Sequence, residues 1–298
     1  MPLIAITGGT GFVGGHLLAQ AAASGYPVRA LTRQPRPNRA GVTWVSGTLD
    51  DPTALLRLVE GVDAVIHVAG LVNAADRAGF AAGNIAGTQA ILTAASVAGV
   101  RRFIHVSSLA AREPGLSDYG WSKAEAERVV LTSDLDHAVV RPPAIYGPGD
   151  RDMFELFWMA ARGVVLLPPG GRFSVIAAED LARLLLTLVS TTGRVSLEPD
   201  DGTPNGWDHK DFARLIGAAV GRAVRPIALP RAVLRTGAAL DRLIRRGNAR
   251  LTDDRVSYMC HPDWVVHPTM SAEPWQPLIP TPAGLRATAS WYRAQGWL

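Results

Sequence analysis

Two side chains that could move a proton together stand four residues apart in Tyr119-Gly-Trp-Ser-Lys123. On a helix, residues four apart share one face, so the phenol and the ammonium would point to the same side. Lys123 and Lys210 are the only lysines among the 30 basic residues. Arginine stays protonated because its pKa lies above ~12, whereas lysine can lower the pKa of a neighbouring phenol and still titrate. The pair predicts general acid–base chemistry, with an ordinary exposed helix face as the alternative.

The first half of the chain predicts the elements that would position this pair. Short apolar runs alternate there with longer amphipathic ones. Continuous apolar strands separated by helices are typical of a parallel sheet covered on both faces. We therefore expect an α/β fold with a Rossmann-type doubly wound parallel sheet. The predicted strands are Leu3–Thr7, Pro27–Thr32, Val42–Val45, Ala64–Ala69, Phe103–Val106 and Ala138–Arg141, and the predicted helices are Phe12–Ser24, Ala54–Glu60, Ala81–Ala98 and Ser117–Thr132.

A glycine-rich loop, Thr7-Gly-Gly-Thr-Gly-Phe-Val-Gly14, joins the first predicted strand to the first predicted helix. Gly8 permits the tight turn, Gly11 lets the backbone approach a pyrophosphate, and Gly14 lets helix and strand pack closely. The anion would lie at the helix N-terminus. The loop therefore predicts a dinucleotide site, with a purely structural glycine turn as the alternative. The residues expected to contact the cofactor here are Gly8, Thr10, Gly11, Phe12, Val13 and Gly14.

The end of the second predicted strand should determine which dinucleotide is preferred. An acidic side chain there would bond the ribose 2′-hydroxyl and repel a 2′-phosphate. Residues 1–49 contain no aspartate or glutamate, whereas Arg29, Arg33, Arg36 and Arg39 cluster in this region. Arg33 is placed to pair bidentately with a 2′-phosphate. The sequence favours NADP(H) and leaves NAD(H) possible; the alternative is that these arginines only solubilise a loop.

The third and fourth predicted strands also end in candidate cofactor contacts. Asp50, which follows Leu49, could accept a hydrogen bond from the adenine amino group. The competing role is a helix N-cap, which Asp50 or Asp51 would fill equally well just before a proline. Ala69 and Gly70 are small and would leave room for the ribose and the nicotinamide. We expect all four candidates, Leu49, Asp50, Ala69 and Gly70, to border the cofactor.

After Pro142-Pro143 the regular alternation loosens into a smaller, mostly helical C-terminal part. We expect a NAD(P)-binding Rossmann domain at 1–145 and a substrate-binding part at 146–298. Some chain should return to the Rossmann sheet near 173–191. Further predictions are helices at about 151–162, 179–191, 208–220 and 229–246, strands near 164–167 and 194–198, a proline-rich stretch from Pro262 to Pro282, and core or interface roles for Trp264, Trp275, Trp291 and Trp297.

Composition and charge indicate which kinds of partner the chain is not expected to bind. A net charge of +4 over 298 residues is modest, and the densest basic stretch, Arg242–Arg250, is better interpreted as a solvated helix end than as a nucleic-acid site. Apolar runs such as Leu184–Val189 are far shorter than the ~20 residues of a membrane helix. Cys260 is the single cysteine, His67 has no partner at metal-ligand spacing, and Met1 leads directly into a strand. We expect a cytoplasmic protein with no nucleic acid, membrane or metal partner.

Five motifs in order carry a family resemblance: the glycine loop, Asn84 in Asn-Ile-Ala-Gly-Thr88, Ser107-Ser108, Tyr119-x-x-x-Lys123 and Arg141-Pro-Pro-Ala-Ile-Tyr-Gly-Pro-Gly149. Over roughly residues 1–190 the chain resembles the extended short-chain dehydrogenase/reductases. It is similar to their NAD(P)-dependent epimerase/dehydratase family, and closer to the 3β-hydroxysteroid dehydrogenase and flavonol-reductase-like branch than to sugar-nucleotide epimerases. The resemblance implies a NAD(P)-dependent enzyme with a small-molecule substrate, and a homodimer is a possible assembly.

The resemblance also implies a role for each motif residue. Tyr119 would exchange a proton with the substrate oxygen, and Lys123 would lower the pKa of the phenol. Ser108 would hydrogen-bond the substrate oxygen, with Ser107 as the fallback. Asn84 would support the proton path, with helix capping as an equal alternative. The other residues expected to border the nicotinamide and its ribose are Ser107, Tyr119, Lys123, Pro142, Pro143 and Ile145.

The first functional hypothesis is a NADP(H)-dependent oxidoreductase that interconverts a secondary alcohol and a ketone or aldehyde on a small or medium apolar substrate. Its pocket would include the apolar side chains Met153, Phe154, Phe157 and Trp158, which equally have the spacing of a helical core.

Two alternatives remain. A nucleotide-sugar epimerase or dehydratase would use the same serine, tyrosine and lysine, and would need cations such as Arg151, Arg162 and Arg172 to bind a diphosphate. A non-catalytic NADP(H)-binding protein with a regulatory or assembly role is the alternative from another class.

Overall fold

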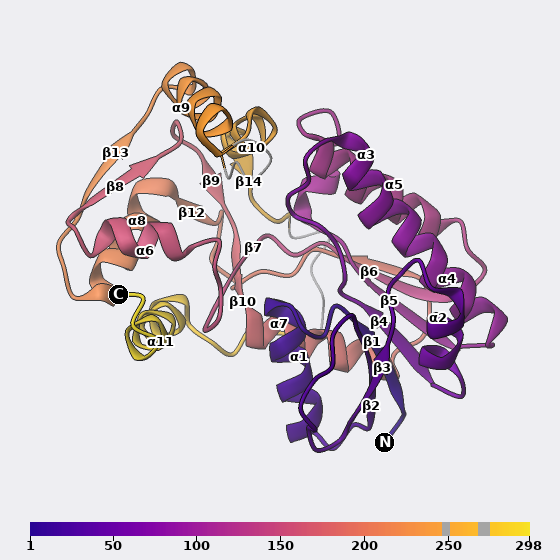
Figure 1. Cartoon of the computed structure of the whole chain (residues 1–298). Helices are drawn as coiled ribbons and strands as arrows, with labels where there is room; N and C mark the ends of the chain where they lie inside the picture. The colour runs from indigo at the N-terminus through magenta and orange to yellow at the C-terminus, as the bar shows by residue number, and fades with distance from the viewer. Residues whose placement is uncertain (246–250, 268–274) are drawn as a thin grey trace. The chain divides into compact units, whose positions relative to one another are not determined.

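The computed structural model of the chain describes residues 1–245, 251–267 and 275–298. It divides into two compact units (Figure 1). The first unit comprises Met1–Arg141 with Leu181–Leu197, and the second comprises Pro142–Asp180 with Glu198–Leu298. The assignment of cofactor binding to 1–145 and of substrate binding to 146–298 stays a prediction.

The first unit is built on a sheet of seven parallel strands in the order β11-β6-β5-β4-β1-β2-β3 (Figure 1). From β1 the chain winds outward to β3 on one side and then back to β4 and outward to β6 on the other, which is the doubly wound arrangement. This confirms the predicted Rossmann-type fold. The strands are β1 (Ile4–Thr7), β2 (Val28–Thr32), β3 (Val42–Ser46), β4 (Ala64–His67), β5 (Arg102–Val106), β6 (Asp136–Val140) and β11 (Val195–Leu197).

Helices cover both faces of this sheet. Figure 1 shows α2, α4 and α5 on one face and α1 and α7 on the other. Apolar strand residues such as Ile4, Ala5 and Ile6 are fully buried, which explains why the strands read as unbroken apolar runs. The elements are α1 (Phe12–Ala23), α2 (Pro52–Val59), α3 (Arg77–Phe80), the π-helix η1 (Ala81–Ala86), α4 (Gly87–Val97), the 3₁₀ helix η2 (Leu109–Arg112), α5 (Asp118–Leu131), α7 (Ala178–Thr187) and the 3₁₀ helix η3 (Leu188–Ser190).

The helix predicted to begin at Ala81 begins one turn earlier. Asp76 is its N-cap, because the Asp76 carboxylate accepts a hydrogen bond of 2.8 Å from the Gly79 backbone N–H. α3, η1 and α4 follow one another without a break. The π-helical turn lies in the middle of this run, a feature that often marks functional sites.

The strand predicted near 194–198 is present as β11, but it belongs to the seven-stranded sheet rather than to the second part of the chain. It pairs in parallel with β6. The buried guanidinium of Arg102 holds the segment before β11 against the sheet. It donates to the carbonyls of Leu188 and Gly193, and it pairs with Asp136 of β6 at 2.8 Å.

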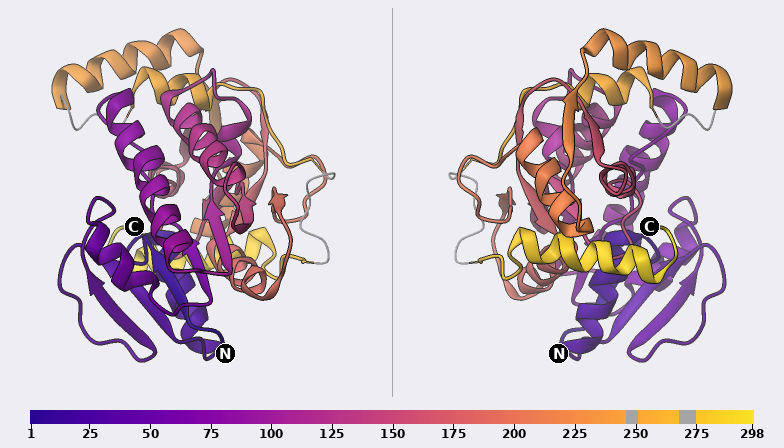
Figure 2. Two further views of the ribbon diagram at one scale, coloured as in Figure 1. Left: turned by 90° about the vertical axis from the view of Figure 1, so that its right-hand side faces the viewer. Right: turned by 90° about the vertical axis from the view of Figure 1, so that its left-hand side faces the viewer.

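The second unit contains three small sheets, β10-β7, β12-β9-β14 and β13-β8, and several helices. Figure 2 shows α9 lying along α10 in two side views. The strands are β7 (Ala144–Tyr146), β8 (Val164–Leu167), β9 (Arg172–Phe173), β10 (Val175–Ala177), β12 (Trp207–Asp208), β13 (Arg225–Ala228) and β14 (Asp263–Trp264), and the helices are α6 (Phe154–Ala160), α8 (His209–Val220), α9 (Arg231–Arg245), α10 (Asp253–Met259) and α11 (Thr281–Ala294).

An aromatic core holds the second unit together. Phe157 is fully buried, and its ring lies 5.1 Å from that of Tyr292. Tyr292 in turn stacks on Trp297 at 5.8 Å. Phe157 is thus a core residue, which is the alternative that its helical spacing allowed. Trp158 is 44% exposed instead and lies beneath the guanidinium of Arg162 at 3.5 Å.

Some predictions fall outside the described residues. These are the helix end at residue 246, the part 246–250 of the basic stretch, and the part 268–274 of the proline-rich stretch. The last residues of that stretch start α11, whose first turn contains Pro282, a position that suits proline.

Candidate active site

The predicted cofactor residues of the first unit follow the carboxyl ends of five neighbouring strands. Because the strands are parallel, these ends lie at one edge of the sheet, where nucleotides bind in doubly wound folds. The fold therefore brings these segments of the sequence to one edge. Along the order β5-β4-β1-β2-β3 they are Ser107 with Ser108, Ala69 with Gly70, the loop Gly8–Gly14, Arg33, and Leu49 with Asp50.

Two glycines of the loop, Gly8 and Gly14, leave no room for a side chain. Gly8 has φ +74°, and a Cβ on it would lie 2.6 Å from the backbone nitrogen of Ala69. A Cβ on Gly14 would lie 2.0 Å from the Gly8 carbonyl oxygen. Gly11 is the N-cap of α1 and provides no side-chain cap. The first N–H groups of α1 are thus left for an anionic ligand, and the cradle fits a dinucleotide pyrophosphate.

The structure separates the two roles considered for the aspartates after β3. Asp51 is the N-cap of α2, because its carboxylate accepts a hydrogen bond of 3.0 Å from the Ala54 N–H. Asp50 is exposed, and hydrogen bonds, chiefly from the Thr48 side chain, lower the pKa of its carboxyl. Its carboxylate is not used as the cap of α2. Arg33 is also exposed, directly after β2.

Asn84 is buried in the π-helical turn and connects two segments of the site. Its side-chain oxygen accepts from the Leu71 N–H at 2.6 Å, and its amide donates to the Leu71 carbonyl at 3.0 Å. The same amide donates to Ser122 of α5 at 2.8 Å. Asn84 therefore holds the segment after β4 against α5, and it does not cap a helix.

The two serines after β5 have different surroundings. The Ser107 hydroxyl donates to the buried carboxylate of Glu127 at 2.5 Å. The Ser108 hydroxyl accepts from the Ala110 N–H at 3.2 Å, and its own hydrogen has no acceptor among the described residues. The Ser107 hydroxyl is thus already used in a bond inside the protein, whereas the Ser108 hydroxyl still has a hydrogen that it could donate to a ligand.

Lys123 is a buried ammonium on α5. It is 5% exposed, and its Nζ donates to the carbonyl of Val106 at 2.9 Å. Burial lowers the pKa of Lys123 to about 8, while the nearby carboxylate of Glu127 acts in the opposite direction. The ammonium is therefore mainly charged at neutral pH and titrates just above it.

Tyr119 lies one turn before Lys123 on α5, as the spacing predicts. Ser117 caps this helix through a bond of 2.9 Å from the Gly120 N–H. A Cβ on Gly120 would lie 2.8 Å from the Ala110 carbonyl oxygen, so the first turn of α5 packs tightly on η2. This contact places the turn that carries Tyr119 against the segment that carries Ser108. The Tyr119 ring also contacts that of Phe80, with centroids 6.1 Å apart.

Glu127 and Arg141 form a buried ion pair that the sequence did not predict. Glu127 is 2% exposed, and its carboxylate accepts from Arg141 at 2.6 Å (Nη2) and 2.9 Å (Nε) as well as from Ser107. Glu127 stands one helical turn after Lys123, as Lys123 stands one turn after Tyr119. That spacing was the available signal, but burial of an acidic residue could not be inferred from it.

Two stacked histidines lie in the interior of the sheet. His67 accepts from Thr7 at 2.6 Å and donates to Thr88 at 2.9 Å, the tautomer that follows because the Thr88 hydroxyl donates to the Asn84 carbonyl. Burial lowers the pKa of His67 to about 3. The ring of His105 lies 5.5 Å from that of His67, and neither of its nitrogens has a hydrogen-bond partner among the described residues. The bonds of His67 to Thr7 and Thr88 are those of a structural residue.

His105 gives a prediction on acid stability. Burial lowers the pKa of its imidazole well below 6.5, so below pH 6.5 the unfolded chain binds a proton that the folded chain does not. The free energy of unfolding then decreases by about 1.4 kcal/mol for each unit by which the pH is lowered, as far as this group is concerned. His105→Leu should remove that part, which is about 2 kcal/mol between pH 6.5 and pH 5. Urea unfolding at both pH values measures it.

The exposed His267 supplies the matched control, since His267→Leu removes a histidine from the surface and no buried imidazole. At pH 7, His105→Leu should be as stable as the wild type or more so, because it removes two buried nitrogens without partners. If His105→Leu loses as much stability between pH 6.5 and pH 5 as the wild type does, His105 is protonated in the folded protein.

The remaining cofactor candidates, Pro142, Pro143 and Ile145, lie in the second unit. Ile145 is the middle residue of β7 and is paired with Ile176 of β10. Their contact with a nicotinamide stays a prediction.

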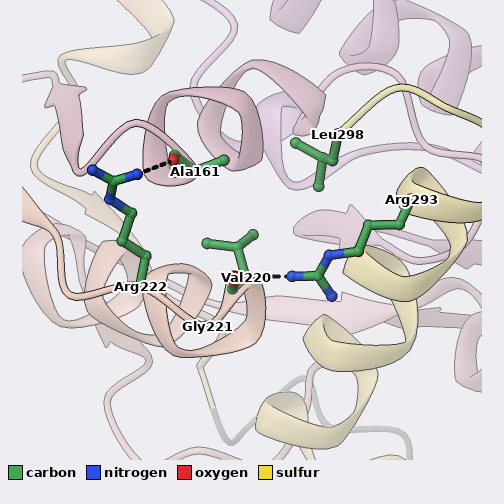
Figure 3. A pocket seen from close by; sticks show the side chains of 6 residues that line it. All are labelled: Ala161, Val220, Gly221, Arg222, Arg293 and Leu298. Carbon is green, nitrogen blue, oxygen red and sulfur yellow. Dashed lines mark hydrogen bonds between the residues drawn. The ribbon is translucent and has the colours of Figure 1, made fainter.

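A cavity of about 470 Å³ lies within the second unit and contains none of the predicted site residues. Arg222 donates to the carbonyl of Ala161, and Arg293 donates to the carbonyl of Val220 (Figure 3). Both guanidiniums are thus used to join α6, α8 and α11, and the cavity is not assigned to the chemistry. The six lining residues are Ala161, Val220, Gly221, Arg222, Arg293 and Leu298.

Two absences hold for the part of the chain that the structure describes. None of its helices combines the length and the apolar character that a crossing of the bilayer requires. Over the same residues, histidine, cysteine, aspartate and glutamate side chains form no group of three suited to a metal ion.

Comparison with known sequences adds the family. Residues 4–195 match the model of the NAD dependent epimerase/dehydratase family. The chain is 38% identical to a ceramide reductase of Caulobacter vibrioides over 99% of this chain and 96% of the relative. It is 30% identical to a 2-alkyl-3-oxoalkanoate reductase of Stenotrophomonas maltophilia over 95% of this chain and 97% of the relative.

Solved structures agree with the fold. MoeE5 in complex with UDP-glucose and NAD is similar at a TM-score of 0.76, with 22% identity and 99% of both chains covered. The human epimerase family protein SDR39U1 with NADPH is similar at a TM-score of 0.76, with 21% identity, 97% of this chain and 99% of that chain covered. At such identities the likeness concerns the fold alone.

The chain therefore belongs to the NAD dependent epimerase/dehydratase family, within the extended short-chain dehydrogenase/reductases. It is a NAD(P)-dependent enzyme of that type, as the resemblance implied.

Proposed function

We propose that this enzyme is a NADPH-dependent ketone reductase that interconverts a ketone and a secondary alcohol on a ceramide-type lipid. The ceramide reductase relative, at 38% identity over nearly the whole of both chains, supports the substrate class. The observation that carries the reaction type is the buried Lys123 ammonium on the same helix as Tyr119, next to a serine whose hydroxyl hydrogen is available.

Each residue has a role in this reaction. When bound, the nicotinamide would provide the hydride that reduces the carbonyl carbon. The Ser108 hydroxyl donates a hydrogen bond to the carbonyl oxygen, and the Tyr119 phenol gives that oxygen its proton. A phenol with a pKa near ~10 needs a neighbouring cation to reload and release a proton at neutral pH, and Lys123 provides that charge. Asn84 is a positioning residue, because it ties Ser122 of α5 to the segment after β4.

Net reduction is favoured over sugar-nucleotide chemistry by the arginines of the second unit. The three cations considered for a diphosphate all have local partners, and the guanidinium of Arg151 lies 5.3 Å from the centre of the Trp297 ring. Arg172 donates to the carbonyls of Asn205 at 2.7 Å and Gly206 at 2.8 Å. Arg162 lies on the Trp158 ring and donates to the Trp158 carbonyl at 3.0 Å. A nucleotide diphosphate would have to compete with these bonds.

The direct test is a turnover assay with the wild-type enzyme. We expect NADPH to be consumed with a ceramide whose secondary alcohol is oxidised to the ketone, presented in detergent micelles, and the alcohol to be found by mass spectrometry. UDP-glucose should cause no change. Conversion of UDP-glucose without net consumption of NADPH would support the epimerase alternative instead. Binding of NADPH with turnover of neither substrate would support the non-catalytic alternative.

Coenzyme preference rests on Arg33. We propose that its exposed guanidinium pairs with the 2′-phosphate of NADPH, a charge-assisted bond worth about 1.5–3 kcal/mol. Arg33→Ser should therefore weaken NADPH binding by roughly 10- to 100-fold and leave NADH binding nearly unchanged. Fluorescence titration with both nucleotides measures this.

Arg36→Ser is the matched control for Arg33→Ser, because it removes an exposed arginine three residues further along the same loop. Tighter binding of NADH than of NADPH by the wild type would overturn the preference. A cytoplasmic location, a homodimer and the absence of a nucleic-acid partner also stay predictions.

A further inference from the structure

Helix α9 is amphipathic, and its apolar face is exposed. Of its residues, only Ala238 is buried. Four large apolar side chains are open to solvent: Val233 (49% exposed), Leu240 (54%), Leu243 (76%) and Ile244 (77%). Single exposed apolar residues are ordinary, but four on one helix of a folded unit require a partner or a function.

The spacing of these residues defines one face. Val233, Leu240 and Ile244 are separated by seven and four residues, so they line one side of the helix, with Leu243 beside them. The arginines are placed elsewhere: Arg235 and Arg242 are seven apart and lie on the opposite side. α9 thus has an exposed apolar face and a basic polar face.

The side of α9 that packs on its own unit lies between these two faces and overlaps the edge of each. The Asp241 carboxylate accepts from the Leu251 N–H at 2.9 Å, and Arg231 donates to Ser257 of α10 at 3.2 Å. Gly237 lies on the apolar face itself, four residues after Val233, and a Cβ on it would lie 3.5 Å from the Leu251 side chain. Leu251 thus borders the apolar face, and the four large apolar side chains of that face stay exposed beside it.

We propose that α9 docks this enzyme on the surface of a bilayer that contains anionic lipids. A helix with a basic polar face and an apolar face lies in the plane of the interface, with the apolar side chains among the acyl chains. α9 has four arginines against one aspartate, and that aspartate is paired with Arg245 at 3.2 Å. This charge is complementary to anionic headgroups, and long arginine side chains reach the headgroup level from a partly buried helix.

The element that precedes α9 adds apolar surface. β13 ends at Ala228, and α9 begins three residues later at Arg231. Ile227 of β13 is 37% exposed and is paired in register with Leu166 of β8, which is 45% exposed. The paired strands β13 and β8 thus add exposed apolar side chains to the surface that precedes α9 in the chain.

This inference goes beyond the proposed reaction and does not depend on it. The expectation that no membrane is involved came from the length of the apolar runs, which detects helices that span a bilayer but not helices that lie on it. If the substrate is a ceramide-type lipid, docking would bring the enzyme to the layer in which such a substrate is dissolved.

Vesicle flotation of the full-length wild-type protein tests the proposal. We expect it to float with vesicles of phosphatidylcholine and phosphatidylglycerol in equal parts, and not with phosphatidylcholine alone. Leu243→Ser together with Ile244→Ser should weaken binding to the mixed vesicles by more than about a hundredfold, because two apolar side chains no longer enter the lipid. Arg235→Ser together with Arg242→Ser should weaken it about thirtyfold.

Leu278→Ser is the control, since Leu278 is 69% exposed outside α9 and its loss should not affect flotation. Melting curves establish that each variant is folded. Absence of wild-type flotation, or flotation that survives Leu243→Ser with Ile244→Ser, would overturn the proposal. So would a vesicle-free dimer, seen by light scattering, that this double variant dissociates, because the occupant would then be a second copy. Flotation without turnover of any ketone would refute the proposed function and leave the docking surface intact.

Discussion

Tyr119→Phe should lower kcat for ketone reduction by roughly a hundred- to ten-thousandfold, because general acid–base catalysis contributes that much. The change removes the hydroxyl and keeps the ring that contacts Phe80. The first turn of α5 is held by the Ser117 cap and by the contact of Gly120 with Ala110, neither of which involves the phenol. The melting temperature should therefore stay within a few degrees of the wild type. Steady-state kinetics with saturating NADPH measures the effect on kcat.

Tyr26→Phe is the matched control, since it removes a phenolic hydroxyl from the first unit but away from the strand ends that form the site. It should leave kcat unchanged. A loss confined to NADPH affinity in Tyr119→Phe would assign the phenol to cofactor binding alone. Full activity in Tyr119→Phe would refute its role as the acid. A reduced kcat with intact NADPH affinity is the pattern that the proton-transfer role requires.

Much of the first unit could be predicted because its signals are local. The glycine loop, the pair Tyr119 and Lys123, and the apolar strands each depend on neighbours within one helical turn or one strand. Parallel pairing then places the strand ends at one edge of the sheet, so residues far apart in sequence meet there without any further information. The same reasoning located Arg33 and Asp50, although which aspartate caps α2 depended on the course of the chain at Asp51.

What the sequence could not provide is burial that depends on distant contacts. Glu127 looks like any acidic residue on a helix surface, and only the arrival of Ser107 and Arg141 makes it a buried anion. His105 similarly reads as one polar residue in a strand, and its lack of partners follows from the fold. The short strands of the second unit were missed for the same reason. β9 and β14 have only two residues each, and pairing rather than local sequence defines them.

The second large effect is expected for Glu127→Gln. Removing one partner of a buried ion pair leaves the other charge uncompensated, which typically costs about 3–5 kcal/mol of folding free energy. Arg141, whose side chain is 21% exposed, would keep its guanidinium opposite a neutral amide. Urea unfolding measures the loss. Glu125→Gln is the control, because its carboxylate pairs with Arg128 on the exposed surface of the same helix and should cost less than about 1 kcal/mol.

Glu127→Gln should also change the pH dependence of the reaction, which separates a role in the site from a role in folding. The Glu127 carboxylate raises the pKa of Lys123, which burial has lowered to about 8. Without that carboxylate the pKa of Lys123 falls further, so the alkaline limb of kcat/KM should move to lower pH. Adding Arg141→Gln removes the guanidinium that has lost its carboxylate, so the double variant should lose less stability than the two single losses combined. Strict additivity, with an unmoved alkaline limb, would mean that the ion pair neither stabilises the fold as a pair nor tunes Lys123.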